Sequence, residues 1–232
     1  MNNQIEKSPT DRTLILMRHG EKGLNGALTV NGIKEAEALG RRLRLMHPPL
    51  QSVCTSTRQR VIDTAAAVTR GFGADTPCHQ TEVLSMSMVF LGPNGDFENR
   101  VDARLATAHA SSEAEREDAV LTAERESMME WLGKNDVPLD KCTKSPLEVA
   151  DKIATFVHTQ LRDAVSGTLS IDVTHEFHVA AFVQNYLIHG RQGVPFGRID
   201  YLEGVEIMMN EAGNLRARFR NNIYRLSFFD VL

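Results

Sequence analysis

Two histidines directly follow apolar segments of the kind that form buried strands, and arginine and hydroxyl residues lie between them in the sequence. Arg18 and His19 follow the run LILM, and His175 follows SIDVT. Ser56 and Arg60 lie between them, at the start of an expected helix. Arginine guanidinium groups match the geometry of a phosphate and stay charged, and a histidine beside them can attack phosphorus. These residue types therefore predict a site for phosphoryl transfer.

The elements that must position these residues alternate between strand and helix in the first half of the chain. Apolar runs predict strands, and apolar residues at helical spacing predict helices. The expected order is strand, helix, strand, helix, strand, over residues 13–17, 29–46, 50–55, 57–70 and 78–84. This order favours a parallel sheet with helices on both faces, and such sheets bind ligands at the carboxyl ends of their strands.

The second half of the chain contains a helical block and then returns to the sheet. Residues 92–140 are first turn-rich and then polar and rich in Ala and Glu, so we expect a helical insertion that caps the sheet. The remaining expected elements are a helix, a strand, a helix and two strands, over residues 146–164, 168–174, 177–187, 205–209 and 215–219. We therefore expect one domain over residues 1–232, a three-layer α/β/α sandwich with a mostly parallel central sheet and a helical cap.

Composition argues against several other classes of protein. The net charge of −4 gives no basic field for nucleic acid. The three cysteines are widely spaced without a CxxC pattern, which disfavours a disulfide framework or a zinc site and fits a reducing compartment. No apolar run approaches about 18 residues and the N-terminus lacks a secretory signal, so we expect a cytoplasmic protein that does not span a membrane. The apolar C-terminal segment NNIYRLSFFDVL can pack on the core or on a partner subunit, so a homodimer stays open.

Four spaced motifs resemble those of the histidine phosphatase superfamily, which has the phosphoglycerate mutase-like fold. In chain order they are Arg18-His19-Gly20, the helix start Leu28-Thr29-x-x-Gly32, the pattern Ser56-x-x-x-Arg60-x-x-x-Thr64-Ala65 and the strand-end His175. Arg-His-Gly alone would be a weak signal, whereas four matches in the family's order are specific.

The resemblance implies a mechanism that needs neither a metal nor a cofactor. Neutral His19 attacks phosphorus and becomes phosphorylated, while Arg18, Arg60 and His175 bind the equatorial oxygens of the phosphoryl group. Ser56 is expected beside the same phosphate. The sequence HEFH that begins at His175 lacks the HExxH spacing of a zinc site, so no metal ligands are expected.

Two residues near the Arg-His-Gly motif are further candidates for the phosphate pocket. Asn25 lies where many family members place an asparagine beside the phosphate. Glu21 is equally compatible with an ordinary loop carboxylate and with a group that orients the pocket.

The general acid is the point at which the sequence departs from the family's common pattern. Many members carry Leu-x-Glu shortly after the third strand, but here the sequence reads LSM, with Met86 in place of the glutamate. Glu176 directly follows His175, and acid-phosphatase-like members carry His-Asp at this point. Glu82 is the other candidate, and the sequence favours Glu176. Either carboxyl group needs a raised pKa to act as an acid near neutral pH.

We therefore expect a metal-independent phosphatase that hydrolyses a phosphomonoester of a small metabolite, such as a sugar phosphate, through a phosphohistidine. A phosphomutase would use the same site, but only seven residues separate Gly20 from Leu28, fewer than in phosphoglycerate mutases. A non-catalytic protein that binds a phosphorylated ligand is the second alternative, because the glutamate of Leu-x-Glu is missing.

Overall fold

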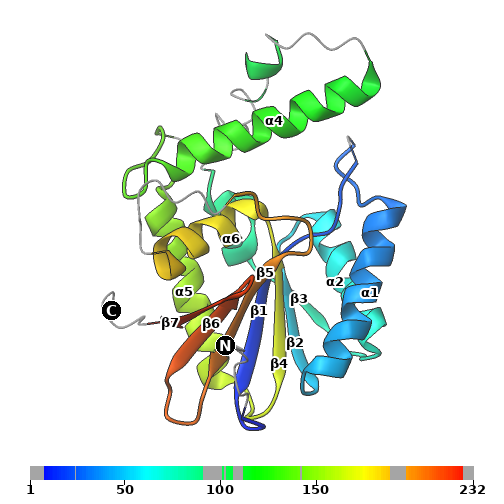
Figure 1. Cartoon of the computed structure of the whole chain (residues 1–232), viewed down its shortest axis with the longest axis vertical. Coiled ribbons are helices and arrows are strands. Elements are labelled where there is room, and N and C mark those ends of the chain that lie inside the picture. The colour runs from blue at the N-terminus through cyan, green and yellow to red at the C-terminus, as the bar shows by residue number, and fades with distance from the viewer. Residues whose placement is uncertain are drawn as a thin grey trace.

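A seven-stranded sheet forms the centre of the computed structural model (Figure 1). The structure describes residues 8–23, 25–90, 101, 103–106, 112–141, 143–188 and 197–226. The strands are β1 (Arg12–Arg18), β2 (Leu50–Thr55), β3 (Cys78–Gln80), β4 (Leu169–Thr174), β5 (Gly204–Met209), β6 (Leu215–Phe219) and β7 (Asn222–Leu226). Their order across the sheet is β3-β2-β4-β1-β5-β6-β7. The first four strands in this order are parallel, and β5, β6 and β7 pair antiparallel with their neighbours.

Helices cover both faces of the sheet, so the predicted three-layer α/β fold is confirmed (Figure 1). The helices that flank the sheet are α1 (Val30–Met46), α2 (Gln59–Phe72), α5 (Pro146–Asp163) and α6 (Glu176–Phe182). Side chains of a strand alternate between its two faces. In β1, Met17 packs in the cluster of α1 and α2, whereas Leu14 and Leu16 pack in the cluster of α5 and α6. Each face of the central strands is therefore buried by one pair of helices.

The third strand and the second helix end at different residues from those that the sequence predicts. β3 stops at Gln80, and a 3₁₀ turn (Glu82–Leu84) follows, because the Thr81 hydroxyl accepts a hydrogen bond from the Val83 N–H and starts this turn. α2 runs two residues past its expected end and stops before Gly73, whose φ of 75° is easily adopted by glycine.

The structure contains two further features after β4 that the sequence analysis does not predict. α6 continues into a π-helical segment (Val183–Leu187). β7 was not predicted, and it forms from the apolar C-terminal segment by pairing with β6. The rest of that segment, residues 227–232, lies outside the described residues.

Helix α4 (Glu113–Leu132) lies across the carboxyl ends of the strands, where the sequence predicts a cap (Figure 1). A capping box between Ser112 and Glu115 begins the helix. At its other end the buried Trp131 donates its Nε1–H to the Lys144 carbonyl oxygen at 2.7 Å. Residues 92–100, 102 and 107–111 of the expected cap lie outside the described residues. None of the helices described is both long and apolar enough to cross a membrane.

Candidate active site

The carboxyl ends of the neighbouring strands β1 and β4 bring two histidines together. The sheet register pairs Arg18 with Thr174, and the next residue, His19, donates its backbone N–H to the Thr174 carbonyl oxygen at 2.9 Å. The ring centroids of His19 and His175 are 5.5 Å apart. Both rings line the same cavity, as the positions at two parallel strand ends lead us to expect.

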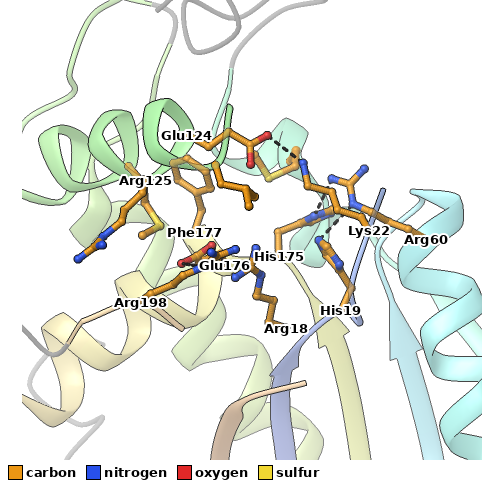
Figure 2. Close-up of a pocket in the computed structure, with 13 residues that line it drawn as sticks. Arg18, His19, Lys22, Arg60, Glu124, Arg125, His175, Glu176, Phe177 and Arg198 are labelled. Atoms are coloured by element: carbon orange, nitrogen blue, oxygen red, sulfur yellow. Dashed lines mark hydrogen bonds and ion pairs between the residues drawn. The ribbon is translucent and has the colours of Figure 1, made fainter. Parts of the chain in front are cut away.

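This cavity lies between the strand ends and α4 (Figure 2). Its volume is about 80 Å³, whereas common small-molecule pockets measure roughly 300–1,000 Å³. Five cationic side chains and two carboxylates line it, so its charge favours an anion. The lining residues are Arg18, His19, Lys22, Arg60, Met86, Leu121, Glu124, Arg125, Met128, His175, Glu176, Phe177 and Arg198.

His19 is neutral and has the tautomer that a nucleophile needs. Its Nδ1 lies 2.8 Å from the Gly20 carbonyl oxygen. Because a carbonyl oxygen only accepts, Nδ1 carries the proton and Nε2 keeps its lone pair. The Nε–H of Arg60 donates to this Nε2 at 3.1 Å. Burial first, and then the charge of Arg60, lower the pKa of His19 to about 3, so the ring is neutral near pH 7.

His175 lies between Arg60 and Ser56. Arg60 Nη2 is 3.4 Å from Nδ1 of His175, and Ser56 Oγ is 3.0 Å from Nε2. An arginine only donates, so in this arrangement Nδ1 accepts and Nε2–H donates to the hydroxyl. A serine hydroxyl can also donate, so Ser56 is compatible with either tautomer of His175. Burial, the largest cause, lowers the pKa of His175 well below its ordinary value.

The buried guanidinium of Arg18 is fixed by three different groups. Its Nη1 donates to the Ile199 carbonyl oxygen at 2.6 Å and to Glu176 Oε2 at 2.8 Å. Its central carbon lies 4.2 Å from the centroid of the Tyr201 ring. Within the described chain its Nε is buried without a hydrogen-bond partner, so this N–H is available to a bound anion.

Glu176 lies at the side of the cavity, in contact with two guanidinium groups (Figure 2). Its Oε2 pairs with Arg18, and its Oε1 is 3.8 Å from Nε of Arg198. Burial raises the pKa of Glu176, although both guanidinium groups act in the opposite direction. The residue thus combines the raised pKa that an acid needs near neutral pH with the position of a counter-ion to Arg18.

Several motif residues hold the loop after β1 and do not face the cavity. The Gly20 N–H donates to the Thr64 hydroxyl at 3.0 Å, which ties the loop to α2. Glu21 Oε2 accepts a hydrogen bond from the Thr29 hydroxyl at 2.6 Å, and this hydroxyl also caps α1. A Cβ on Gly32 would lie 2.6 Å from the Glu21 carbonyl oxygen, so only glycine fits beside the loop.

Four residues that the sequence predicts for the site are not among those lining the cavity. They are Glu21, Asn25, Ser56 and Glu82. The first and third lie behind the site, where they orient the loop after β1 and the ring of the second histidine. Asn25 is exposed, and its Oδ1 accepts the Ala27 N–H at 3.0 Å within a turn. Glu82 is also exposed and accepts a hydrogen bond from the Ser87 hydroxyl at 2.7 Å.

Other residues of the site were not predicted from the sequence. They are Lys22, Glu124, Arg125, Arg198 and Tyr201. The first two form an ion pair of 2.8 Å between the loop after β1 and helix α4. Residues 198–201 reach the site because they precede β5, whose first residue pairs with Met17 near the carboxyl end of β1. A prediction that β5 runs antiparallel to β1 would have pointed to them, since the start of such a strand lies at the end of its neighbour.

The second histidine of the HEFH sequence has a separate environment. His178 is buried in α6, and its Nε2–H donates to the Ser85 carbonyl oxygen at 3.1 Å. Burial lowers the pKa of His178 to about 4. In the part of the chain that the structure describes, no three His, Cys, Asp or Glu side chains are grouped so that they could hold a metal ion.

Comparison with known proteins shows similarity in part of the sequence and in the whole fold. Residues 14–85 match the model of the histidine phosphatase superfamily (branch 1). Phosphoglycerate mutase from Bacillus anthracis str. Sterne has a TM-score of 0.57 and 16% identity, with 92% of this chain and 94% of that chain covered. A mycobacterial glucosyl-3-phosphoglycerate phosphatase has a TM-score of 0.60 and 16% identity, with 94% and 100% covered. No curated protein matches the sequence.

A third solved structure is similar over nearly its whole length. Phosphoserine phosphatase from Entamoeba histolytica, in complex with 3-phosphoglyceric acid, has a TM-score of 0.59 and 16% identity, with 95% of this chain and 100% of that chain covered. At such low identity these likenesses show a shared fold. The family model matches residues 14–85, a segment that contains Arg18, His19 and Arg60. Together these comparisons show that the chain is similar to the histidine phosphatase superfamily in this segment and shares the fold of phosphoglycerate mutase-like proteins.

Proposed function

We propose that this protein is a metal-independent phosphatase that hydrolyses a phosphomonoester of a small metabolite through a phosphohistidine on His19. The observation that carries the proposal is the unprotonated Nε2 of a neutral His19 in a small cationic cavity. Arg18, Arg60 and His175 line the same cavity and supply donors for three phosphoryl oxygens. A nucleophile and its anion-binding groups are thus together before any substrate binds.

The proposed reaction has two in-line displacements at phosphorus. In the first, His19 Nε2 forms a bond to phosphorus while the bond from phosphorus to the alcohol oxygen breaks, and a carboxylic acid gives that oxygen a proton. In the second, water loses a proton to the same carboxylate and attacks the phosphohistidine, which releases phosphate and restores His19. Among the described residues, Glu176 and Glu124 are the two carboxylates that line the cavity, and one of them supplies the proton.

The small cavity and the short loop after β1 support a phosphatase with a compact substrate. The loop is held by an antiparallel bridge between Lys22 and Leu28, and Lys22 itself lines the cavity. The solved structures of similar fold are named for phosphoglycerate, glucosyl-3-phosphoglycerate and phosphoserine, which are small phosphorylated metabolites. We therefore propose a substrate of this class.

The proposal is tested by trapping the intermediate and measuring phosphate release. With p-nitrophenyl phosphate and a panel of phosphorylated metabolites, we expect phosphate release that persists in the presence of EDTA. A base-stable, acid-labile phosphoryl group should appear on His19. His19→Ala should lower kcat by at least about 10⁴-fold. His79→Ala, at an exposed position of β3, is the matched control and should leave kcat unchanged.

Two other results would replace the proposal. Exchange between phosphorylated isomers without release of phosphate would identify a phosphomutase on the same site. Binding of inorganic phosphate without turnover at any pH between about 4 and 8 would identify a non-catalytic binding protein.

A further inference from the structure

The position of the leaving group decides which carboxylate can act as the acid. In a phosphoryl transfer the attacking and leaving atoms lie roughly in line on opposite sides of phosphorus. His19 attacks from the end of β1, and Glu124 of α4 lies on the other side of the cavity (Figure 2). The leaving oxygen therefore departs toward α4, and an acid on that helix is in the right place to protonate it.

Burial raises the pKa of Glu176, but its carboxylate also holds the guanidinium of Arg18 in place. It is the carboxylate partner of the buried Arg18 at 2.8 Å, and it also lies 3.8 Å from Arg198. Protonation of Glu176 would leave the Arg18 guanidinium buried without its counter-ion, which is costly. Arg18 must in turn stay fixed to bind the phosphate. These contacts give Glu176 the role of a positioning residue for Arg18.

Glu124 faces the cavity from α4 and has a partner that can leave it. Its Oε1 accepts a hydrogen bond from Lys22 Nζ at 2.8 Å, and the two side chains are 29% and 19% exposed. Figure 2 shows this pair above the two imidazoles, whereas Glu176 lies to the side beside Arg198. Both members of the pair are long, flexible side chains, so the contact can break without rearrangement of the backbone.

A bound phosphate ester would compete for the ammonium group of Lys22. Lys22 lines the cavity next to His19, within reach of an anion there. A phosphate dianion attracts this ammonium more strongly than one carboxylate does, because it carries more charge and more acceptor oxygens. Glu124 would then lie beside a dianion with no cation of its own, and a neighbouring negative charge favours the protonated form of a carboxyl group.

We propose that Glu124 is the general acid and base of the reaction and that its ion pair with Lys22 opens when the phosphate of the substrate takes Lys22 away. This assignment rests on the proposed phosphatase function. Protonated Glu124 gives its proton to the alcohol oxygen as the phosphorus–oxygen bond breaks and the bond from phosphorus to His19 Nε2 forms. The resulting carboxylate takes a proton from the water that attacks the phosphohistidine. When phosphate leaves, Glu124 gives this proton to solvent and pairs with Lys22 again, which returns the proton that Glu124 takes from solvent when Lys22 leaves it.

The test compares leaving groups that do and do not need an acid. p-Nitrophenolate leaves without protonation, whereas the alkoxide of glycerol phosphate does not. In Glu124→Gln we expect the pre-steady-state burst of p-nitrophenol to stay within a few-fold of the wild type, because this step needs no proton. Release of glycerol should fall about 10²–10⁴-fold. Phosphohistidine should accumulate with p-nitrophenyl phosphate, because its hydrolysis has lost its base.

Two other substitutions separate this role from loss of an ion pair or of Arg18. Glu126 lies on α4 like Glu124, and Glu126→Gln removes its 2.8 Å ion pair with Arg104. This substitution should change the rate with neither substrate. Glu176→Gln should slow the burst of p-nitrophenol and the release of glycerol by similar factors, because it disturbs phosphate binding by Arg18. Thermal unfolding of each variant by circular dichroism checks that it is folded.

The results that would overturn the assignment are specific. The assignment of Glu124 is wrong if Glu124→Gln releases glycerol at the wild-type rate. It is also wrong if this substitution slows the reactions of both substrates by the same factor. Equally decisive is a selective loss of glycerol release in Glu176→Gln, which would make Glu176 the acid. A wild-type protein that forms no phosphohistidine with either substrate would instead overturn the phosphatase function itself, and the role of Glu124 with it.

Discussion

The two sides of the cavity are built in different ways. The strand-end side consists of Arg18, His19, Arg60 and His175, and each of these side chains is held by another buried group. Arg60, for example, donates to both imidazoles, at 3.1 and 3.4 Å. The cap side consists of residues of α4, and its contact with the loop after β1 is an ion pair between two partly exposed side chains.

This difference separates two tasks that a phosphoryl-transfer site must perform. Donors that are fixed before the substrate binds need no rearrangement when charge develops in the transition state, so the strand-end side suits stabilisation of that charge. Side chains on an overlying helix can move or be replaced without disturbing the strand ends, so the cap side suits recognition of the substrate and release of the alcohol. Substitutions on the two sides should therefore have different kinetic signatures.

Arg60 lies on the strand-end side, so Arg60→Gln should lower kcat/KM. The expected loss is larger than that from removal of a cap charge such as Arg125, which only attracts the substrate. Both imidazoles lose a donor, and the phosphate loses a guanidinium, so we expect kcat/KM for p-nitrophenyl phosphate to fall about 10²–10³-fold. Because the charge of Arg60 helps to lower the pKa of His19, its loss should raise that pKa toward the ordinary value. The acid limb of the pH profile should then move to higher pH.

Two variants make the Arg60 result specific. Arg60→Lys keeps the charge but cannot span both rings, so it should recover little activity. Arg58→Gln removes an exposed arginine just before α2 and outside the cavity lining, and its activity should be close to that of the wild type. If Arg60→Gln raised KM and left kcat intact, the strand-end side would bind substrate and transition state alike, and the proposed division of tasks would be wrong.

Asp172 offers an intermediate effect on stability, on the part of β4 below the site. It is fully buried, its Oδ2 accepts a hydrogen bond from Gln160 Nε2 at 2.6 Å, and its Oδ1 has no partner in the described chain. Burial raises the pKa of Asp172 to about 7, above its ordinary value of 3.8. The folded state therefore binds more protons than the unfolded state between these values, and this contribution to stability is lost as the pH rises through about 7.

Asp172→Asn should stabilise the protein at high pH, because it removes a buried charge and keeps an acceptor for Gln160. We expect the free energy of unfolding in urea to rise by about 2 kcal/mol at pH 8 and the gain to shrink toward pH 5. Because the residue is outside the cavity, kcat should not change. Asp163→Asn, at an exposed position, should leave stability nearly unchanged at both pH values. A gain that grew toward pH 5 would contradict the assigned direction of the pKa shift.

The strand-end side could be predicted from the sequence because it depends on local features. Apolar runs ending in Arg18-His19 and in His175 indicate two strand ends, and parallel strands put such ends at one edge. Ser56, Arg60 and Thr64 are spaced four residues apart at and just before the start of α2. This spacing brings Arg60 to the cavity, and it brings Ser56 and Thr64 to His175 and Gly20, with which they form hydrogen bonds.

The cap side could not be predicted in the same way. Which face of α4 points into the cavity depends on how Trp131 and Met128 pack against distant parts of the chain. Glu124 and Arg125 gave no local signal, because a charged residue on a polar helix is usually solvated. Asn25 was expected from a family position and Glu82 from its closeness to Leu84, and the structure places both side chains at exposed positions in turns.

The smallest effect comes from Arg125→Gln, which tests the cap side alone. Arg125 is an exposed side chain of α4 that lines the cavity, so it attracts an anionic substrate through solvent-screened charge. We expect KM to rise about threefold with kcat unchanged, and the difference to vanish at high salt. Arg116→Gln, an exposed arginine of the same helix outside the lining, should leave KM unchanged. If Arg125→Gln lowered kcat at every salt concentration, Arg125 would act on the transition state, and the cap would belong to the catalytic apparatus beyond the single acid that we assign to it.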